Sequence, residues 1–427
     1  MPADFEHARS VAVLGAGASG LAAARELTRA GHRVTVLEAR HAIGGQCAAA
    51  EIDGRGHDLG GHGYSPTHHR LDALVAELGL RTTDTGPPLL FDPATGRSRP
   101  RVPGPLCRET LTRYHRVRAE LFPRIADPGL AHSARVLAAP ARRWLAEYRL
   151  SALAEVFGPG YTAAGYGHLD LDLPALYLLK YAELTGLGAG RTRAIEGGFA
   201  ELWRRVAQEL PGLRRGVRVE RITRDADGVR VVVDGTEHTY DDLVLTVGLD
   251  EVLPVLDATE EERALAARIR RLDLYTTLGS VSGLPPGAHT LVQPHLTGSA
   301  SRGHCVSFHR RHPDTEVLVC HAYGRPDLDG PGVADLLRAD VRAWGGQLHR
   351  LHLQRRWRFL PHFDSADLAE GALDRLEALQ GRRRTYHLGG LPAFELVECV
   401  LGYAQDLVRR HFTGLRREVP GHPLLIV

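Results

Sequence analysis

Residues 11–40, VAVLGAGASGLAAARELTRAGHRVTVLEAR, form the stretch that decides the fold. The first four residues are all apolar, which is typical of a buried strand in a parallel sheet. Small and apolar residues at helical spacing follow, and Gly31 ends this predicted helix. A second apolar run over residues 34–37 completes a strand–helix–strand unit. The stretch therefore predicts an α/β fold around a parallel sheet.

A glycine turn joins the first predicted strand to the helix. Gly15, Gly17 and Gly20 give the spacing G-x-G-x-x-G, which permits a tight turn, a close approach of backbone to pyrophosphate, and close packing of helix on strand. The amides of the first helical turn would face the phosphates at the positive end of the helix dipole. Glu38 follows at about the spacing where a carboxylate binds the ribose hydroxyls of an adenosine. These features together predict a dinucleotide-binding site.

Two further glycine groups follow the predicted ribose-binding acid. Gly44 and Gly45 come shortly after it, and Gly60, Gly61 and Gly63 follow a short predicted strand. Glycines have no side chain, so glycines spread over this many residues would let a cofactor much longer than NAD lie along the backbone. The arrangement resembles the flavoproteins of the amine oxidase and phytoene desaturase superfamily, and this resemblance implies a non-covalently bound FAD. It also implies an α/β fold with a discontinuous, Rossmann-like FAD-binding domain of glutathione-reductase type, an antiparallel-sheet substrate domain and a helical cap.

Size and composition limit the classes of protein to consider. With 427 residues, of which 43% are hydrophobic, the chain is long enough for two intertwined domains. The net charge is only +2 and the charges of both signs are mixed, so the composition does not indicate a basic surface that binds nucleic acid or anionic lipid. No apolar stretch approaches the roughly 20 residues that span a bilayer, so we expect no integral membrane segment. The five cysteines form no C-x-x-C pair and the N-terminus has no apolar signal core, so we expect free thiols and a cytoplasmic protein.

The two predicted domains are interleaved along the chain. The FAD-binding domain is expected in residues 1–80, 190–265 and 380–427, and the substrate-binding domain in residues 81–189 and 266–379. Within the second domain, about residues 106–157 show apolar side chains at helical spacing and would form the cap.

Glycine-rich segments interrupt the substrate domain. Residues 158–168, GPGYTAAGYGH, contain four glycines and a proline, so no regular helix is expected there. Residues 174–185 resume a helix. Gly186, Gly188 and Gly190 follow this helix without a strand–helix–strand unit behind them, so we reject a second dinucleotide site. The chain then has no site for NADPH, and electrons reaching FAD must come from the substrate or return to it.

Short apolar or alternating runs predict strands in both domains. They are residues 217–222, 229–233 and 243–247 in the first domain, and residues 276–281, 316–322 and 356–360 in the second, with a helix near 333–344. Residues 385–412 predict a strand, a loop and a long helix that begins near residues 396–398. The N-terminal amides of that helix would point at the C2 carbonyl of the flavin ring, where negative charge develops on reduction.

Three segments carry a closer resemblance that covers nearly the whole chain. GYTAAGYGHLDLDLPALYLLKY at 160–181, WRFLPHFDSADLAEG at 357–371, and residues 379–412 resemble the FAD-dependent polyenoic fatty acid isomerases. The resemblance implies a redox-neutral reaction, in which the flavin removes a hydride from a polyene and returns it at another carbon, so that a double bond moves. It implies a hydrophobic polyene as the substrate, free or carrier-bound. The protein would supply position and a dry pocket.

The sequence departs from that family at three places. No arginine in TDTGPPLLFDP, residues 83–93, matches the family's carboxylate-binding arginine. The sequence is therefore compatible with a polyene that is a free acid, an amide or an ester, and with one that is carrier-bound or bears a ring. Gly390 stands where the family has an acid, and Ala164 stands where it has an aromatic side chain, which leaves more room for the substrate.

Candidate site residues follow from the glycine groups and from the resemblance. The expected cofactor contacts are Gly15, Gly17, Ala18, Ser19, Gly20, Glu38, Ala39, Arg40, Gly44, Gly45, Gln46, Gly60, Gly61, His62, Val219, Gly389, Val397 and Glu398. The expected pocket residues are His62, Tyr161, Ala164, Tyr166, His168, Lys180 and Phe394, each with ordinary packing as the alternative. No side-chain base is expected to be catalytic beyond the flavin itself.

Other chemistries have weaker support in the sequence. His309-x-x-His312 and His349-x-x-His352 have no cysteine or acid at useful spacing, so we expect no metal. Cys399, at the start of the last helix, could have a lowered thiol pKa, although catalysis by it is not expected. Besides an isomerase, a flavin oxidase or desaturase of the same superfamily stays open, as does a flavoprotein whose FAD is structural or aids cyclisation without net redox change.

Overall fold

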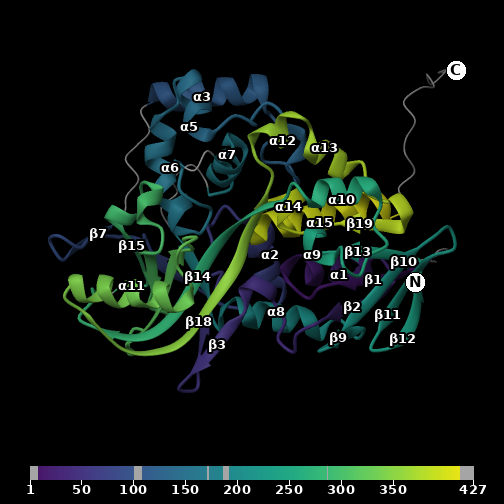
Figure 1. The fold of residues 1–427 in the computed structure, drawn as a ribbon, viewed down its shortest axis with the longest axis horizontal. Coiled ribbons are helices and arrows are strands. Elements are labelled where there is room, and N and C mark those ends of the chain that lie inside the picture. Colours follow the sequence, from purple (N-terminus) through teal and green to yellow (C-terminus); the bar gives the residue numbers. More distant parts are fainter. Residues whose placement is uncertain (1–7, 101–107, 171–172, 186–191, 286, 414–427) are drawn as a thin grey trace, which may run out of the picture.

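A five-stranded parallel sheet and a seven-stranded, mostly antiparallel sheet organise the molecule (Figure 1). The structure is a computed structural model, and it describes residues 8–100, 108–170, 173–185, 192–285 and 287–413. The α/β fold with an antiparallel second sheet is confirmed. The rejected glycine loop at residues 186–190 lies outside the described residues.

The parallel sheet has the strand order β19-β13-β1-β2-β9. Its strands are β1 (Ser10–Leu14), β2 (Arg33–Glu38), β9 (Leu213–Arg215), β13 (Asp242–Leu245) and β19 (Thr385–His387). Strands from the beginning, middle and end of the chain thus pair side by side, as a discontinuous domain requires. The apolar run that opens β1 is buried because helices α1 (Ala18–Arg29) and α15 (Val397–His411) pack nearby.

Three smaller sheets flank this one. They contain β10 (Val219–Arg224), β11 (Val229–Val233) and β12 (Thr236–Tyr240); β3 (Ala49–Ile52) and β4 (Arg55–Asp58); and β5 (Thr82–Gly86) and β8 (Thr192–Ile195). The first is an antiparallel meander at the end of the molecule beside β9 in Figure 1.

The seven-stranded sheet has the order β18-β14-β17-β16-β15-β6-β7. Its strands are β6 (Leu89–Asp92), β7 (Arg97–Pro100), β14 (Arg270–Ser282), β15 (His289–Val292), β16 (Cys305–His309), β17 (Val317–Tyr323) and β18 (Gln347–His362). The expected strands near 276–281, 316–322 and 356–360 are confirmed within β14, β17 and β18. Helix α11 (Gly330–Ala343), the expected helix near 333–344, packs on β14, β16 and β18.

Helices cover the upper part of the molecule in Figure 1. The cap contains α3 (Arg108–Leu121), α4 (Ala131–Ala134), α5 (Ala141–Glu147), α6 (Ala152–Ala163) and α7 (Ala175–Leu184). The other helices are α2 (His69–Glu77), α8 (Gly198–Gln208), α9 (Leu249–Val252), α10 (Glu260–Ala266), α12 (Ser365–Ala369), α13 (Ala372–Glu377) and α14 (Gly390–Ala393). Short 3₁₀ turns are η1 (Gly45–Cys47), η2 (Gln293–His295), η3 (Ser299–Ser301) and η4 (Arg382–Arg384). Within the described residues, none of these helices is both long and apolar enough to cross a bilayer.

The expectation that residues 158–168 are not helical is wrong for the first half of that segment. Helix α6 continues through Pro159 and ends at Ala163. A Cβ on Gly158 would lie 2.9 Å from Leu169 Cδ1, so the glycine serves close packing there and not a turn. Phe157 and Tyr161 of the same helix are buried, and their packing stabilises it. Tertiary packing thus overrides the low helix propensity of this segment.

Lys180, the only lysine of the chain, is a buried structural cation. Its Nζ donates to the carbonyl oxygens of Ile125, Asp127 and Gly129 at 2.7, 2.6 and 3.2 Å. These three carbonyls belong to the loop between α3 and α4, so the ammonium group fixes this loop onto α7. Burial lowers the pKa of Lys180.

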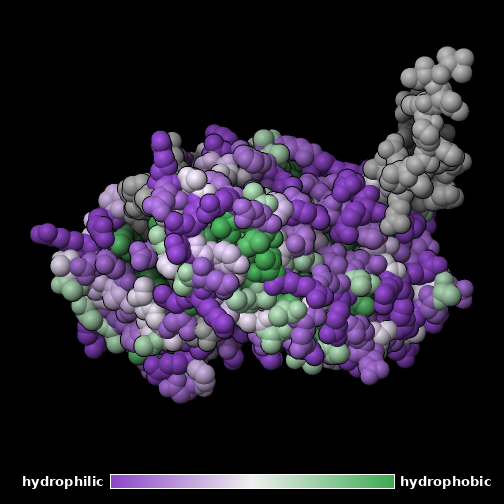
Figure 2. Space-filling model, turned by 90° about the horizontal axis from the view of Figure 1, so that it is seen from above, coloured by the Kyte–Doolittle hydropathy of each residue, from purple (hydrophilic) through white to green (hydrophobic). Residues whose placement is uncertain are grey.

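The surface seen from above is mostly hydrophilic, and hydrophobic residues gather in a patch near its centre (Figure 2). Such a surface is usual for a globular protein with a buried core.

Replacing Lys180 with Met should lower the free energy of unfolding by about 2–4 kcal/mol, because three buried carbonyl groups lose a charged donor. The measurement is denaturant unfolding of both proteins. Arg143→Met, at an exposed position of neighbouring α5, is the matched control and should change stability by less than about 0.5 kcal/mol. Equal stabilities of the Lys180 and Arg143 variants would contradict this role.

Candidate active site

A cavity of about 1150 Å³ lies between the parallel sheet and the seven-stranded sheet. Its wall includes residues that follow β1, β2, β13 and β19 at their carboxyl ends, and residues on β14, β16, β17 and β18 of the other sheet. The cavity therefore opens where ligands of open parallel sheets bind.

The first two glycine groups lie in contact at one end of this cavity. A Cβ on Gly20 would come within 1.9 Å of the Gly15 carbonyl oxygen, so α1 approaches the end of β1 as closely as two backbones can. The second group is held against this turn by a hydrogen bond from Gly44 N to Ala16 O of 2.8 Å. A Cβ on Gly45 would lie 3.0 Å from the Cα atom of Gly17. The two groups thus form one continuous stretch of bare backbone.

The third glycine group extends this wall. A Cβ on Gly60 would lie 2.6 Å from Gln46 O, and Gly61 has a φ of 71° with the Phe199 ring where its side chain would stand. Fourteen of the expected cofactor contacts line the cavity, namely Gly17, Ala18, Ser19, Glu38, Ala39, Arg40, Gly44, Gly45, Gln46, Gly60, Gly61, His62, Gly389 and Val397. Gly15, Gly20, Val219 and Glu398 are not part of its wall.

Glu38 is fixed at the end of β2 by backbone donors. Its Oε2 accepts a hydrogen bond from Ala16 N at 2.7 Å, and its Oε1 accepts one from Arg40 N at 2.8 Å. Val217 N donates to the Glu38 carbonyl at 3.1 Å, so the segment just before β10 lies beside the acid, whereas Val219 lies outside the wall.

Two helices begin at the cavity. Helix α1 starts at Ala18 and α15 starts at Val397, and both residues line the wall. The expected start of the last helix is thus confirmed, and the positive ends of two helix dipoles face the same space. The Glu398 side chain points elsewhere, because it accepts hydrogen bonds from Arg70 N and Leu71 N in the first turn of α2.

The expected pocket residues divide into two layers. His62, Ala164 and Tyr166 line the cavity, whereas Tyr161, His168, Lys180 and Phe394 do not. The Tyr166 ring stacks on Phe394 with 4.8 Å between centroids and packs at 5.4 Å from Tyr161, so these two rings support Tyr166 from behind.

His168 and Cys399 also have structural surroundings. His168 is fully buried, and its Nε2 lies 3.2 Å from both His295 O and Ser301 Oγ. These contacts hold neighbouring loops together, so the role of His168 is structural. Burial raises the pKa of the Cys399 thiol to about 12, contrary to the lowered value considered from its position at a helix start.

Glu395 is a cavity residue that the sequence did not reveal. Its Oε1 accepts a hydrogen bond from Gln46 Nε2 at 2.6 Å, and its Oε2 accepts one from Leu360 N. Desolvation raises the pKa of Glu395 to about 7. The partners come from distant parts of the chain, so only the fold brings them together.

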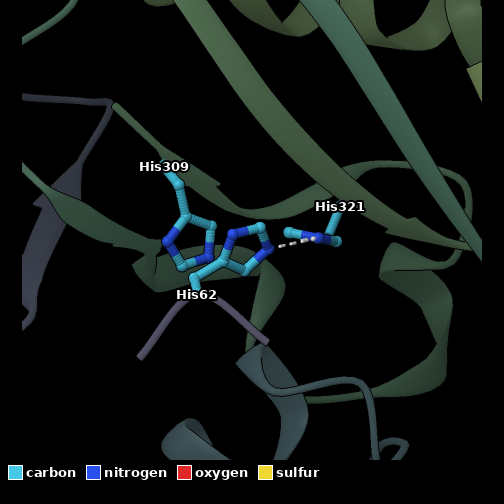
Figure 3. A group of neighbouring side chains, drawn as sticks. All are labelled: His62, His309 and His321. Atoms are coloured by element: carbon cyan, nitrogen blue, oxygen red, sulfur yellow. Dashed lines mark hydrogen bonds between the residues drawn. The ribbon is translucent and has the colours of Figure 1, made fainter. Parts of the chain in front are cut away.

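Four histidines meet on the floor of the cavity. His289 on β15 lies directly opposite His309 on β16, and His321 on β17 lies opposite Ser307, two residues from His309 and on the same face. His62 reaches over from the third glycine group and stacks on His309 at 3.8 Å, while its Nε2 lies 3.3 Å from His321 Nε2 (Figure 3). Burial lowers the pKa of His62, His309 and His321.

The sequence pairs considered as metal ligands are not the ones that the fold assembles. His309 joins His62 and His321 instead of His312, and His349 and His352 hydrogen-bond to Ser282 and Ser280. The group could have been predicted only from two facts together: residues two apart on a strand share a face, and the strand order makes β15, β16 and β17 neighbours.

Comparison with known families and proteins identifies the relatives of this chain. The family model for flavin containing amine oxidoreductases matches residues 18–367. Putrescine oxidase of Kocuria rosea is 50% identical over 74 residues, which cover 17% of this chain and 16% of that protein. Pseudooxynicotine dehydrogenase of a Pseudomonas species is 31% identical over 129 residues, which cover 29% of this chain and 26% of that protein. The chain thus matches only about a sixth to a quarter of the length of these curated relatives.

Solved structures agree over nearly the whole chain. The CLA-producing fatty acid isomerase from P. acnes has a TM-score of 0.86 at 24% identity and covers 95% of this chain and 99% of that one. Putrescine oxidase with bound putrescine has a TM-score of 0.66 at 18% identity and covers 95% of this chain and 99% of that one. At these identities the likeness concerns the fold. Together with the family match, it confirms the resemblance drawn from the sequence.

The ionisation of Glu395 should give the protein a recognisable pH dependence. Because its pKa is raised in the folded state, the native protein holds a proton that the unfolded chain releases between about pH 4.5 and 7. The stability of the wild type should therefore fall relative to Glu395→Gln as the pH rises from 5 to 8, by at most about 1.4 kcal/mol per pH unit. Gln46 can rotate its amide to keep a hydrogen bond to the new side chain.

Urea unfolding at several pH values measures this difference. Glu51→Gln, at an exposed position of β3, is the control and should follow the wild-type pH profile. If wild type and Glu395→Gln keep a constant difference from pH 5 to 8, Glu395 does not titrate in this range.

Proposed function

The chain belongs to the family of flavin containing amine oxidoreductases, and from this premise we propose that it is an FAD-dependent isomerase that moves double bonds in a hydrophobic polyene. The observation that carries the proposal is the fold it shares with a fatty acid isomerase over almost its full length. The cavity chemistry described next supports the same reaction class.

The residues at the cavity fit FAD in its extended form. The three glycine groups offer bare backbone where side chains would otherwise fill the space, the α1 terminus suits a diphosphate, and Glu38 suits ribose hydroxyls. The α15 terminus at Val397 suits the flavin's pyrimidine carbonyl. Burial raises the pKa of both Cys47 and Cys399 to about 12, and protonated thiols favour a non-covalent cofactor.

The wall has no excess of negative charge that would favour a protonated amine as the substrate. Among the described residues, seven arginines and four glutamates line the cavity. Arg271, Arg311 and Arg356 pair with three aspartates behind the wall, and these aspartates balance the excess of arginine. Glu395 is a weak counter-ion for an ammonium group, because desolvation raises its pKa to about 7.

When bound, FAD supplies a two-electron acceptor that can take a hydride and give it back. The chain's own part is to hold a flexible polyene in one orientation and to exclude water. Phe157, Leu291 and Phe359 supply apolar wall, and Tyr166 is locked by stacking on Phe394 and by donating a hydrogen bond to Glu395 O at 2.9 Å. Burial lowers the pKa of the three floor histidines, so they add no positive charge to the site.

An oxidase or desaturase is the alternative, and the sequence relatives favour it. These relatives include a putrescine oxidase and a pseudooxynicotine dehydrogenase. Oxygen consumption separates the alternatives because an isomerase returns its electrons to the product.

Replacing Glu38 with Ala should lower the flavin content of the purified protein by about 10-fold or more, because a carboxylate with two backbone donors is lost at the ribose position. Flavin absorbance per chain is the measurement. Glu51→Ala, an exposed acid outside the wall, should keep the wild-type content. A fully yellow Glu38→Ala protein would refute the assignment.

Anaerobic incubation with polyunsaturated acids, esters and amides tests the reaction class. We expect products of unchanged mass with shifted double bonds, and an oxidised flavin after each turnover. The measurement is mass spectrometry of the products together with the flavin absorbance. Turnover that requires oxygen and releases stoichiometric peroxide would establish the oxidase instead.

A further inference from the structure

We propose that His62, His309 and His321 form a site for one divalent transition-metal cation of the zinc class, open toward the cavity. The site does not depend on the isomerase activity, and none of the family relationships above supplies it. It rests on the meeting of one glycine-loop histidine with two histidines of the sheet floor (Figure 3).

The distances fit tetrahedral coordination. One nitrogen of each ring lies within 4.8 Å of the other two. The His62 Nε2–His321 Nε2 separation of 3.3 Å equals the edge of about 3.3 Å expected for a tetrahedron with metal–nitrogen bonds of about 2.0–2.1 Å. His309 then needs to turn out of its stack on His62 and to approach by at most about 1.5 Å, because an imidazole binds a metal in the plane of its ring.

The surroundings keep the three imidazole rings in the neutral form that can bind a metal. His309 and His321 are each 7% exposed, and burial keeps all three imidazoles neutral, the form that has a free lone pair. His289 also stacks on His309, with 3.9 Å between the ring centroids. Because all three rings line the cavity, a fourth position stays open for water or for an oxygen of a substrate head group.

Arg311 is the charge that opposes a cation here, since it helps to lower the pKa of His62. Its guanidinium forms an ion pair with Asp58, Nη1 to Oδ2, at 3.0 Å, which offsets part of this repulsion. A metal would replace the hydrogen bond between His62 Nε2 and His321 Nε2.

A second histidine cluster provides an internal control. His295, His304 and Asp340 also lie within 4.8 Å of one another. Their polar atoms already hold the start of β16: His304 Nδ1 pairs with Asp340 Oδ1 at 2.8 Å, Cys305 N donates to Asp340 Oδ2, and His295 Nδ1 bonds to Cys305 O. Binding a metal there would break these bonds, so we assign the cation to the first cluster.

The test is calorimetric titration of the chelator-treated, flavin-containing protein with zinc chloride, together with metal analysis after dialysis. We expect one zinc per chain, and a loss of affinity of about 100-fold or more in His321→Gln and in His309→Gln. His304→Gln, which disables the second cluster, should bind zinc as the wild type does. X-ray absorption of the zinc protein should show three nitrogen ligands at about 2.0–2.1 Å.

Two results would overturn the proposal. One is a wild-type protein without saturable zinc binding. The other is binding that disappears in His304→Gln but persists in His321→Gln and His309→Gln. Thermal melting of each variant without metal confirms that it is folded, and His62→Gln replaces any variant that is not.

Discussion

The contact between Gly20 and the Gly15 carbonyl is the constraint on which the rest of the structure depends. No side chain fits between them, so α1 starts directly at the carboxyl end of β1 and its first amides face outward from the sheet. Glu38 reinforces this geometry by accepting a hydrogen bond from Ala16 N, inside the turn. The second glycine group then docks on the same turn through Gly44, and the cavity begins where these backbones meet.

The cavity has two chemically different walls. Bare backbone and two helix termini form the wall on the parallel sheet, where partial positive charge is fixed by peptide dipoles and costs no reorganisation. Side chains form the opposite wall, on the antiparallel sheet and on α6, where aromatic, aliphatic and neutral imidazole groups stand beside arginines of β14 and β18. Backbone dipoles on the first wall suit the proposed polar cofactor, and the aromatic and aliphatic part of the second suits the proposed hydrophobic substrate.

Features encoded within a few consecutive residues could be predicted, and features made by distant segments could not. The strand, glycine turn, helix and acid of residues 11–40 form as expected because each depends on its own neighbours. The partnership of Gln46 with Glu395 and the meeting of four histidines require strand order and register, which no local pattern contains. The helix through Pro159 is an intermediate case, since burial of Phe157 and Tyr161 outweighs a local signal that is itself correct on average.

Lys180 has one more consequence, which concerns chemical labelling. It carries the only side-chain amine of the chain, and that amine is enclosed by three carbonyls. Acylating reagents should therefore reach Lys180 in the folded protein only when the loop between α3 and α4 opens. The rate of acylation at Lys180, followed by mass spectrometry, then measures local opening of the cap without an engineered probe.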